Sequence, residues 1–473
     1  MSALDVLLNR TGVRAHLVGC GGAGMRALAE LGCDLGWSVS GSDAAANPRV
    51  FQRLAGLGIP VSEGHAAGNI QPGIELVVHS PAVPESNPER TAARLQSRPD
   101  ISYPQALGSI TRKWPTIAIS GTHGKSTTTG LIGTVLTETG GAAAVLCGAE
   151  ELDRRRHGWA AGGRWAVIEA CEYRRHFLEL QPEIAVVLGI EPDHFDCFPE
   201  LSDAIGAYRQ FLERTKVAGL ALVNVDTGGA REALAKADLK TRCETMSTGA
   251  TPADWTAEDI RQSDSLELAI RFRGAPENRV SVPLVGRHHA ANVLAAYAAS
   301  RAAGAGQDEL RDSLTRFSGL GRRLEAFRPW RGVRRFDDYA HHPTAVSAVL
   351  SALREWRQRI GADDGSRIVC VFQPHQVSRT ERLAGEFGSA LSLSDETWVV
   401  PVYAAREAGG TRPAELAKEV VRQCSSPCLA QFVPSLDHAL TRLETALRPG
   451  DIFVTLGAGD IDCLQYELPR RFP

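Results

Sequence analysis

The residues best suited to chemistry lie in the stretch ISGTHGKSTTTG, at positions 119–130. Gly124, Lys125 and Ser126 have the order that closes a phosphate-binding loop, in which the lysine reaches the β- and γ-phosphates and the hydroxyl ligates Mg²⁺. The first glycine of the loop comes two residues late, at Gly121. The strand pattern before the loop and the threonine-rich helix start after it favour a phosphate loop over an ordinary capped glycine turn.

Acidic and imidazole side chains follow two later strand patterns. VIEACE places Glu169 and Glu172 at the end of one strand, and GIEPDHFD places Asp193, His194 and Asp196 at the end of another. Parallel sheets bind ligands at the carboxyl ends of their strands, so these groups are expected near the loop. Each residue alone fits a solvated strand end or a histidine with a satisfied hydrogen bond. Together with the loop they favour a divalent metal.

A second glycine-rich loop lies near the N-terminus, in LVGCGGAGMRALAELG. Gly19, Gly21 and Gly24 match G-x-G-x-x-G between a strand and a helix, and Asp43 ends the next strand. The pattern is typical of dinucleotide binding, because backbone N–H groups at a helix N-terminus hold a pyrophosphate. NAD is one interpretation, UDP carries the same pyrophosphate, and a tight turn without ligand stays open.

The elements that must position these loops alternate between strand and helix patterns along the chain. We predict three α/β domains: a Rossmann-like N-terminal domain at residues 1–113, a central P-loop-type ATPase domain at 114–325 and a Rossmann-like C-terminal domain at 326–473. In the central domain, LELAIRFRG is expected to add an antiparallel strand.

Composition excludes several classes of protein. The 473 residues carry a net charge of −3, with 43% hydrophobic and 23% charged residues, which gives no reason to expect nucleic acid or an acidic membrane as a partner. The ten cysteines form no C-x-x-C pair, so reduced thiols are expected. No apolar run approaches the ~20 residues that span a bilayer. We expect a cytoplasmic protein without membrane insertion.

A series of motifs along nearly the whole chain resembles the Mur ligases of peptidoglycan synthesis. The motifs are GCGGAGM with SGSD, GTHGKST, GRHHAANVLAA, GRRLE, DDYAHHPTAV, VFQPHQVSRT and LGAGDI. The family's ATP loop lacks the early glycine of the usual phosphate loop, which accounts for the late Gly121. The most similar branch of the family joins L-alanine to UDP-N-acetylmuramate.

The resemblance implies an ATP-dependent amide-bond ligase. A carboxylate attacks the γ-phosphate to give an acyl phosphate, and an amine then displaces phosphate. ATP and two Mg²⁺ ions are the implied cofactors, and UDP-N-acetylmuramate and a small amino acid are the implied partners of a monomer or weak homodimer.

The resemblance also assigns residues to roles. The catalytic set is Lys125, Glu169, His194 and Arg323, and the metal set is Ser126, Glu169 and His194. ATP would contact Gly121, Thr122, Gly124, Lys125, Ser126, Thr127, His288, Asn292, Arg323 and Asp338. The UDP-sugar would contact Gly19, Gly21, Gly22, Gly24, Met25, Ser42, Asp43 and Ser80. The amino-acid and lactyl side would be lined by Tyr339, His342, His375 and Arg379.

Several residues depart from the family pattern near the expected amino-acid site. Cys171 stands where the family has an acid, and Arg174 and Arg175 follow it. Gln376 stands for an arginine expected near the carboxylate of the amino acid. One hypothesis is that Arg174 or Arg175 supplies the missing guanidinium. These departures leave the acceptor amino acid open.

Three alternatives remain open. A ligase that recycles a whole murein peptide belongs to a branch without the FQPH…SRT motif. An NAD-dependent dehydrogenase leaves the run from Gly124 to Ser126 unexplained. A non-catalytic Mur-like nucleotide-binding homologue is favoured by the altered EACEYRR stretch and opposed by the intact Lys125, Glu169 and His194.

Overall fold

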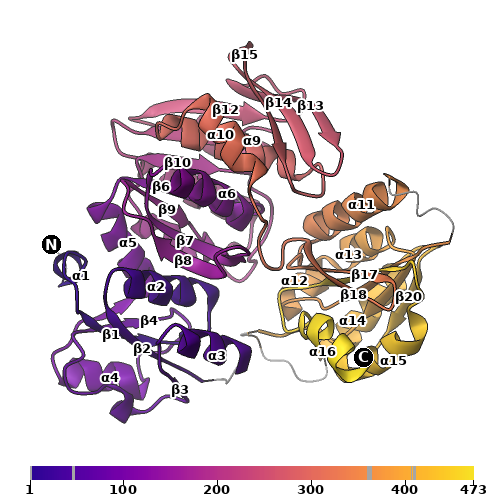
Figure 1. Cartoon of the computed structure of the whole chain (residues 1–473), viewed down its shortest axis with the longest axis horizontal. Helices are drawn as coiled ribbons and strands as arrows, with labels where there is room; N and C mark the ends of the chain where they lie inside the picture. Colours follow the sequence, from indigo (N-terminus) through magenta and orange to yellow (C-terminus); the bar gives the residue numbers. More distant parts are fainter. Residues whose placement is uncertain (1–2, 45–47, 360–364, 406, 408–411) are drawn as a thin grey trace.

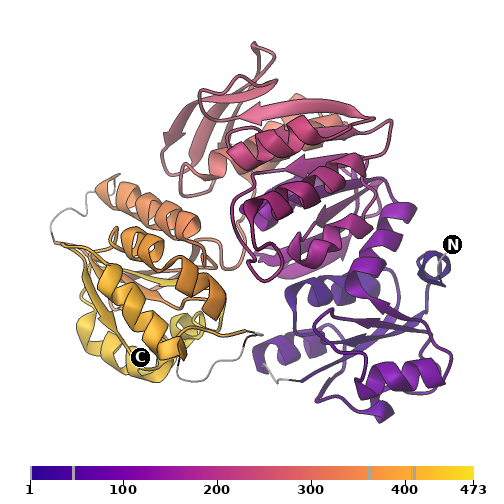
Figure 2. The same cartoon turned by 180° about the vertical axis from the view of Figure 1, so that it is seen from behind.

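Three α/β domains, each built around its own sheet, make up the protein (Figure 1). The computed structural model describes residues 3–44, 48–359, 365–405, 407 and 412–473. The N-terminal and central domains lie next to each other, and the C-terminal domain lies to one side of both, as the view from behind also shows (Figure 2). The predicted fold class is confirmed.

The N-terminal domain holds a five-stranded parallel sheet in the order β3-β2-β1-β4-β5. Its strands are β1 (Arg14–Val18), β2 (Ser38–Asp43), β3 (Val61–Glu63), β4 (Leu76–His79) and β5 (Asp100–Ser102). Its helices are α1 (Ala3–Leu7), α2 (Ala23–Asp34), α3 (Pro48–Gly56), η1 (Ala67–Asn69), α4 (Pro88–Leu95) and α5 (Tyr103–Lys113). The strand order reverses direction at β1, which places the first glycine-rich loop at the usual ligand crevice of such sheets.

The central domain holds a ten-stranded mixed sheet in the order β15-β14-β13-β12-β11-β10-β6-β9-β7-β8. The strands are β6 (Thr116–Ser120), β7 (Ala142–Glu151), β8 (Arg156–Ala160), β9 (Trp165–Glu169), β10 (Ile184–Val187), β11 (Leu220–Asn224), β12 (Arg242–Ser247), β13 (Trp255–Gln262), β14 (Leu266–Phe272) and β15 (Ala275–Val282). The helices are α6 (Lys125–Glu138), η2 (Tyr173–Glu179), α7 (Leu201–Glu213), α8 (Gly228–Lys236), α9 (His289–Ala302) and α10 (Gln307–Thr315). The antiparallel strand expected at LELAIRFRG is β14, which pairs with β13 and β15.

Helix α6, which carries the second glycine-rich loop, is buried along most of its length. Its residues from Ser126 to Leu136 are all buried, and the helix packs against α9 and β7. Fully apolar or small helix surfaces are typical of an element enclosed on all sides. The loop at the start of α6 is therefore held by a rigid core element.

The C-terminal domain holds a six-stranded sheet in the order β16-β17-β21-β18-β19-β20, parallel except for β16. Its strands are β16 (Glu325–Trp330), β17 (Val333–Asp338), β18 (Ile368–Phe372), β19 (Glu396–Val399), β20 (Leu429–Phe432) and β21 (Ile452–Leu456). Its helices are α11 (Pro343–Arg359), α12 (Val377–Arg382), α13 (Ala384–Leu391), α14 (Arg412–Gln423), α15 (Leu436–Ala446) and α16 (Cys463–Arg471).

The domains meet through specific contacts. Helix α2 packs on β7 and β8, where the fully buried Glu30 accepts hydrogen bonds from the backbone N–H of His157 (2.6 Å) and of Gly158 (2.9 Å). The guanidinium of Arg49 lies 3.8 Å from the ring centre of Tyr466, which joins the N-terminal and C-terminal domains. All ten cysteines are free thiols. Among the described helices, none has the length and apolar character needed to cross a membrane.

Candidate functional site

The second glycine-rich loop forms a tight turn between β6 and α6. Gly124 has a φ of 82°, in the left-handed region that favours glycine, and a Cβ atom there would lie 2.1 Å from Asn292 Oδ1. The loop leads directly into the first turn of α6, where backbone N–H groups have no partner within the helix and favour an anion. The residues of this loop therefore form a phosphate-type cradle with Lys125 beside it.

Lys125 lies in a buried ion pair at the mouth of this loop. Its Nζ donates to the carbonyl oxygen of Gly121 (2.5 Å) and lies 2.9 Å from Glu172 Oε1. Burial alone would lower the pKa of Lys125, but the charge of Glu172 raises that pKa above its ordinary value. Burial would likewise raise the pKa of Glu172, and the charge of Lys125 holds it below its ordinary value. Both groups are therefore charged near neutral pH.

The three residues predicted to hold metal line the same cavity. Arg323 donates to Ser126 Oγ (3.0 Å), Glu169 accepts from a backbone N–H of β7 (2.7 Å), and His194 Nε2 lies 3.5 Å from Glu172 Oε1. Glu172 Oε2 and His194 Nδ1 are buried and have no hydrogen-bond partner among the described residues. Buried polar atoms usually have partners, so these free oxygen and nitrogen atoms fit a divalent ion.

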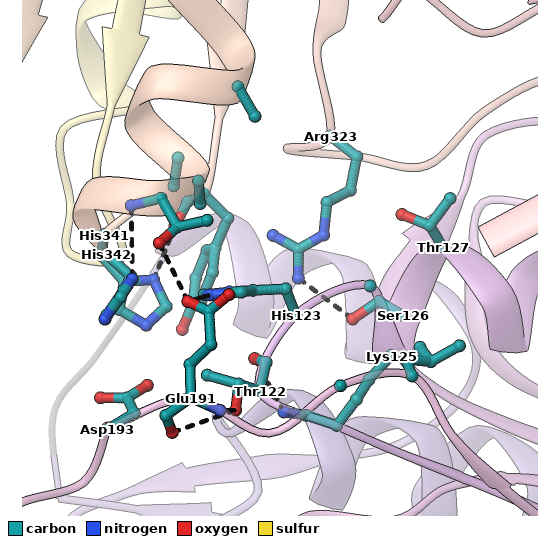
Figure 3. Close-up of a pocket in the computed structure, with 18 of the residues that line it drawn as sticks. Thr122, His123, Lys125, Ser126, Thr127, Glu191, Asp193, Arg323, His341 and His342 are labelled. Carbon is teal, nitrogen blue, oxygen red and sulfur yellow. Dashed lines mark hydrogen bonds and ion pairs between the residues drawn. The ribbon is translucent and has the colours of Figure 1, made fainter. Parts of the chain in front are cut away.

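A cavity of about 660 Å³ lies between the central and C-terminal domains and gathers most of the predicted residues (Figure 3). Those that line it are Thr122, Gly124, Lys125, Ser126, Thr127, Glu169, His194, His288, Asn292, Arg323, Asp338, Tyr339, His342, His375 and Arg379. The volume lies in the range of small-molecule sites. Residues separated by more than 250 positions in the sequence thus share one site.

Two C-terminal motifs meet at the edge of this cavity. The two carboxylate oxygens of Asp338 accept hydrogen bonds from the backbone N–H of Leu324 (2.7 Å) and of Ala340 (2.8 Å). The guanidinium of Arg323 lies 4.9 Å from the ring centre of Tyr339. Asp338 therefore fixes the turn that presents Arg323 to the phosphate loop.

Arg379 links the two domains through a buried ion pair. Its Nε and Nη2 lie 2.9 and 2.6 Å from Asp193 Oδ1, and both residues are buried. Burial would raise the pKa of Asp193, but the charge of Arg379 holds it well below its usual range. The guanidinium predicted on the amino-acid side is thus already engaged by a carboxylate of the central domain.

The residues predicted to bind the UDP-sugar lie together in the N-terminal domain. Gly21 donates its backbone N–H to Asp43 Oδ2 (2.8 Å), and Gly24 packs against the ring of Tyr103. Gly22 caps the start of α2, Gly19 lies against Ser80, and Met25 is buried. Ser42 is fully buried and donates to Glu89 (2.7 Å), so its hydroxyl faces the interior. These residues are not among those that line the 660 Å³ cavity.

Three family models match successive parts of the chain. They are described as the Mur ligase family catalytic domain, matched by residues 14–114, the Mur ligase middle domain, by residues 119–300, and the Mur ligase glutamate ligase domain, by residues 322–459. The chain belongs to the Mur ligase family.

Curated relatives of this Mur ligase match it over almost the whole length. A UDP-N-acetylmuramate–L-alanine ligase of Mycolicibacterium vanbaalenii is 37% identical, covering 96% of this chain and 95% of its own. A ligase of the same name from Chlorobaculum tepidum is 36% identical, covering 94% and 93%. The NAD-dependent dehydrogenase interpretation of the first glycine-rich loop is therefore set aside.

Solved structures share the fold. A UDP-N-acetylmuramate–alanine ligase of Thermotoga maritima superimposes with a TM-score of 0.80 at 24% identity, covering 97% of this chain and 99% of its own. A murein peptide ligase of Psychrobacter arcticus gives a TM-score of 0.73 at 24% identity, covering 97% and 98%. These similarities concern the three-domain architecture.

The departures from the Mur pattern lie at one side of the cavity. Cys171 and Tyr173 line it, whereas Arg174 and Arg175 are exposed and outside its lining. Both arginines have positive φ angles, 49° and 58°, which are uncommon for residues with a side chain. The structure thus does not bring either guanidinium into the cavity, whereas the departures Cys171 and Gln376 both line it.

Several residues in or beside the cavity were not assigned a role from the sequence. Glu172 and Asp193 stood out as strand-end acids, but their pairing with a lysine and an arginine did not. His123 and Glu191 also line the cavity. The presence of an acid in each strand-end motif could have identified the first two residues, whereas nothing in the local sequence around His123 distinguishes it from the rest of the loop.

Proposed function

We propose that this Mur ligase joins L-alanine to UDP-N-acetylmuramate, with ATP as the phosphoryl donor, in the synthesis of peptidoglycan precursors. One observation carries the proposal: the phosphate loop with Lys125 faces the C-terminal motifs of Arg323 and Arg379 across a single cavity. Relatives that bear this activity in their names match the chain along nearly its whole length, which supports the same assignment.

Lys125 and Arg323 would stabilise the negative charge that gathers in the first step. An oxygen of the lactyl carboxylate attacks the γ-phosphorus, and the bond from that phosphorus to the bridging oxygen of ADP breaks, which gives an acyl phosphate. Lys125 and Arg323 stand at the loop where negative charge gathers. Preorganised cations in a partly enclosed site stabilise such charge strongly, because they need no reorientation during the reaction.

Ser126, Glu169 and His194 would hold Mg²⁺, with Glu172 as a further oxygen donor. When bound, the ion supplies Lewis-acid polarisation of phosphoryl oxygens and neutralises their charge. The orphaned atoms Glu172 Oε2 and His194 Nδ1 support this assignment.

In the second step the amino nitrogen attacks the acyl carbon, and phosphate leaves with the bonding electron pair. The ammonium proton passes to solvent. Tyr339, His342 and His375 line the C-terminal side of the cavity, where this amino acid would bind. Gln376 lies there in place of the family arginine, so this wall would set the preference among amino acids.

The test is phosphate release from ATP with Mg²⁺ and UDP-N-acetylmuramate, measured with each common amino acid in turn. We expect release that requires both the sugar nucleotide and L-alanine. The Lys125→Met variant serves as the matched control and should lose this release. Release supported only by another amino acid would contradict L-alanine as the acceptor and retain the ligase chemistry.

A second candidate is a ligase for a longer peptide, favoured by the shared fold of the murein peptide ligase. One arm of the same assay therefore replaces L-alanine with L-alanyl-γ-D-glutamyl-meso-diaminopimelate, the peptide in the name of a related structure. Release with the peptide but not with L-alanine would replace our proposal. The absence of release with any acceptor would refute both.

A further inference from the structure

Three potential metal-ligating side chains, from both domains that line the cavity, converge within it. His123 lies in the phosphate loop, Glu191 follows β10, and His342 precedes α11 of the C-terminal domain (Figure 3). One possible ligand atom from each lies within 4.8 Å of the others. None of the three belongs to the Ser126, Glu169 and His194 set, so this cluster stands apart from the proposed Mg²⁺ ligands.

Hydrogen bonds already hold the cluster close to a ligating arrangement. His123 Nε2 lies 3.3 Å from Glu191 Oε2, and Thr344 Oγ1 donates to the same oxygen (2.9 Å). His342 Nε2 lies 3.2 Å from the carbonyl oxygen of Pro192. Histidine ligands commonly use one ring nitrogen for the metal and the other for a backbone carbonyl. The other ring nitrogen of His342, Nδ1, accepts the backbone N–H of Thr344 at 3.4 Å, so a bound ion would replace this long hydrogen bond.

The distances require only a small adjustment. Ligands at about 2.0–2.1 Å from a tetrahedral zinc ion lie roughly 3.3 Å apart. The ligand atoms lie within 4.8 Å of one another, so bringing them to that spacing needs a shift of at most about 1.5 Å, shared between two side chains. Side chains of His123 and Glu191 are 33% and 29% exposed, so an ion can reach them from solvent.

The donor set discriminates between metals. Two imidazoles and one carboxylate suit Zn²⁺, whereas Mg²⁺ prefers oxygen ligands in octahedral geometry. Binding needs an ionised carboxylate and neutral imidazoles.

We propose that His123, Glu191 and His342 form a Zn²⁺ site that ties the central domain to the C-terminal domain. Two ligands come from the central domain and one from the C-terminal domain, so a bound ion joins the two walls of the cavity. Substrates must pass between these walls, and Zn²⁺ therefore inhibits turnover. The inhibition rests on the proposed ligase activity, whereas the binding does not.

Co²⁺ is the probe for this site, because its visible absorption reports imidazole and carboxylate ligation directly. The full chain is titrated with Co²⁺ in excess Mg²⁺ and without nucleotide. We expect one equivalent of visible absorption, abolished by added Zn²⁺. His123→Gln and Glu191→Gln should each weaken Co²⁺ binding by at least about tenfold, the effect of losing even an outer hydrogen bond at a metal site.

Matched controls separate this site from other candidates. His438→Gln removes an exposed histidine of α15 and should leave the absorption unchanged. His194→Asn alters the proposed Mg²⁺ set and should also leave it unchanged. Absorption that is lost in His194→Asn and kept in His123→Gln would overturn the proposal, as would a titration without visible absorption. Thermal unfolding of each variant confirms that it is folded.

Because the absorption is measured without ATP or amino acid, failure here and failure of the phosphate-release assay are separate results. In that assay, Zn²⁺ should inhibit the wild-type enzyme and the His438→Gln variant alike. Equal Zn²⁺ inhibition in the wild type and in Glu191→Gln would contradict inhibition through this site.

Discussion

The buried pair of Arg379 and Asp193 offers a direct test of how the two domains are held together. The guanidinium lies 2.6 Å from the carboxylate, and the side chains are 2% and 8% exposed. The pair joins α12 of the C-terminal domain to the loop after β10. We predict that replacing Arg379 with methionine weakens domain closure, because it leaves the carboxylate buried without a counter-charge.

The expected size follows from the burial of both partners. Removing one member of a buried ion pair costs about 3–5 kcal/mol, since the remaining charge keeps its desolvation penalty. At 1.36 kcal/mol for each factor of ten, this cost corresponds to about two to four powers of ten in the closure equilibrium. Arg379→Met should therefore reduce kcat/KM for all substrates together.

A double-mutant cycle distinguishes this positioning role from direct binding of the amino acid. Arg379→Met, Asp193→Asn and the double variant are compared by phosphate release and by small-angle scattering of the free protein. If the pair acts as an interdomain contact, the two single variants have similar effects and the double variant is no worse than either.

A different pattern would refute this reasoning. If Arg379 serves chiefly to bind the carboxylate of the amino acid, Arg379→Met raises the KM for the amino acid alone. Asp193→Asn would then leave that KM unchanged or lower it, because the guanidinium is released. Unchanged scattering and unchanged kcat in both variants would likewise contradict the interdomain role.

Three further outcomes are expected. Lys125→Met should lower kcat for phosphate release by about 10²- to 10³-fold, the usual effect of removing a preorganised charge-stabilising donor. Burial raises the pKa of Glu89, but hydrogen bonds from neighbouring side chains hold it at about 2 in the folded protein. Because this folded pKa lies below the unfolded value of about 4.3, the stabilising contribution of Glu89 is present above pH 4.3 and lost as the pH falls towards 2. Urea unfolding between pH 5 and pH 2 should therefore show a shallower loss of stability in Glu89→Gln than in the wild type, and parallel curves would contradict this. Gly158→Ala places a Cβ atom 2.0 Å from the carbonyl oxygen of Ala27 and should destabilise the junction of the first two domains by about 1–3 kcal/mol. Gly206→Ala, where a Cβ atom meets no neighbour within 4 Å, is the control, and equal melting temperatures of the two variants would refute the clash.

Local sequence patterns predicted the architecture because each strand and turn carries its own signature. Buried parallel strands such as TIAIS are continuous apolar runs, and glycines follow them where the chain turns sharply into a helix. The strand order of the sheets, including the placement of β21 between β17 and β18, depends on packing between distant segments. No local pattern encodes that order.

The sequence predicted those residues of the site that belong to recognisable motifs. The phosphate loop, Glu169 and His194 lie in the same cavity, as expected for strand ends of one parallel sheet. The partner of each charge was not predictable. Lys125 meets Glu172 across 47 positions and Arg379 meets Asp193 across 186, because these pairs form only when separate elements pack. Ser42 was predicted from its motif to contact the UDP-sugar, but in the folded protein its hydroxyl donates to the buried Glu89.

The ion pairs in the cavity also indicate which of its cations gains most from binding a phosphate. Lys125 and Arg379 each already contact a carboxylate of the protein, whereas Arg323 donates to the hydroxyl of Ser126. Among the described residues, no carboxylate lies within ion-pair distance of Arg323. A phosphate that approaches Lys125 or Arg379 must share the cation with a carboxylate of the protein, so the net attraction between phosphate and cation is weaker. At Arg323 it replaces only a neutral hydrogen bond, and the Asp338 carboxylate that also attracts this charge lies beyond ion-pair distance. Arg323 follows the last strand-helix unit of the central domain and leads into the C-terminal domain, so the cation with the most to gain from phosphate lies where the two domains join.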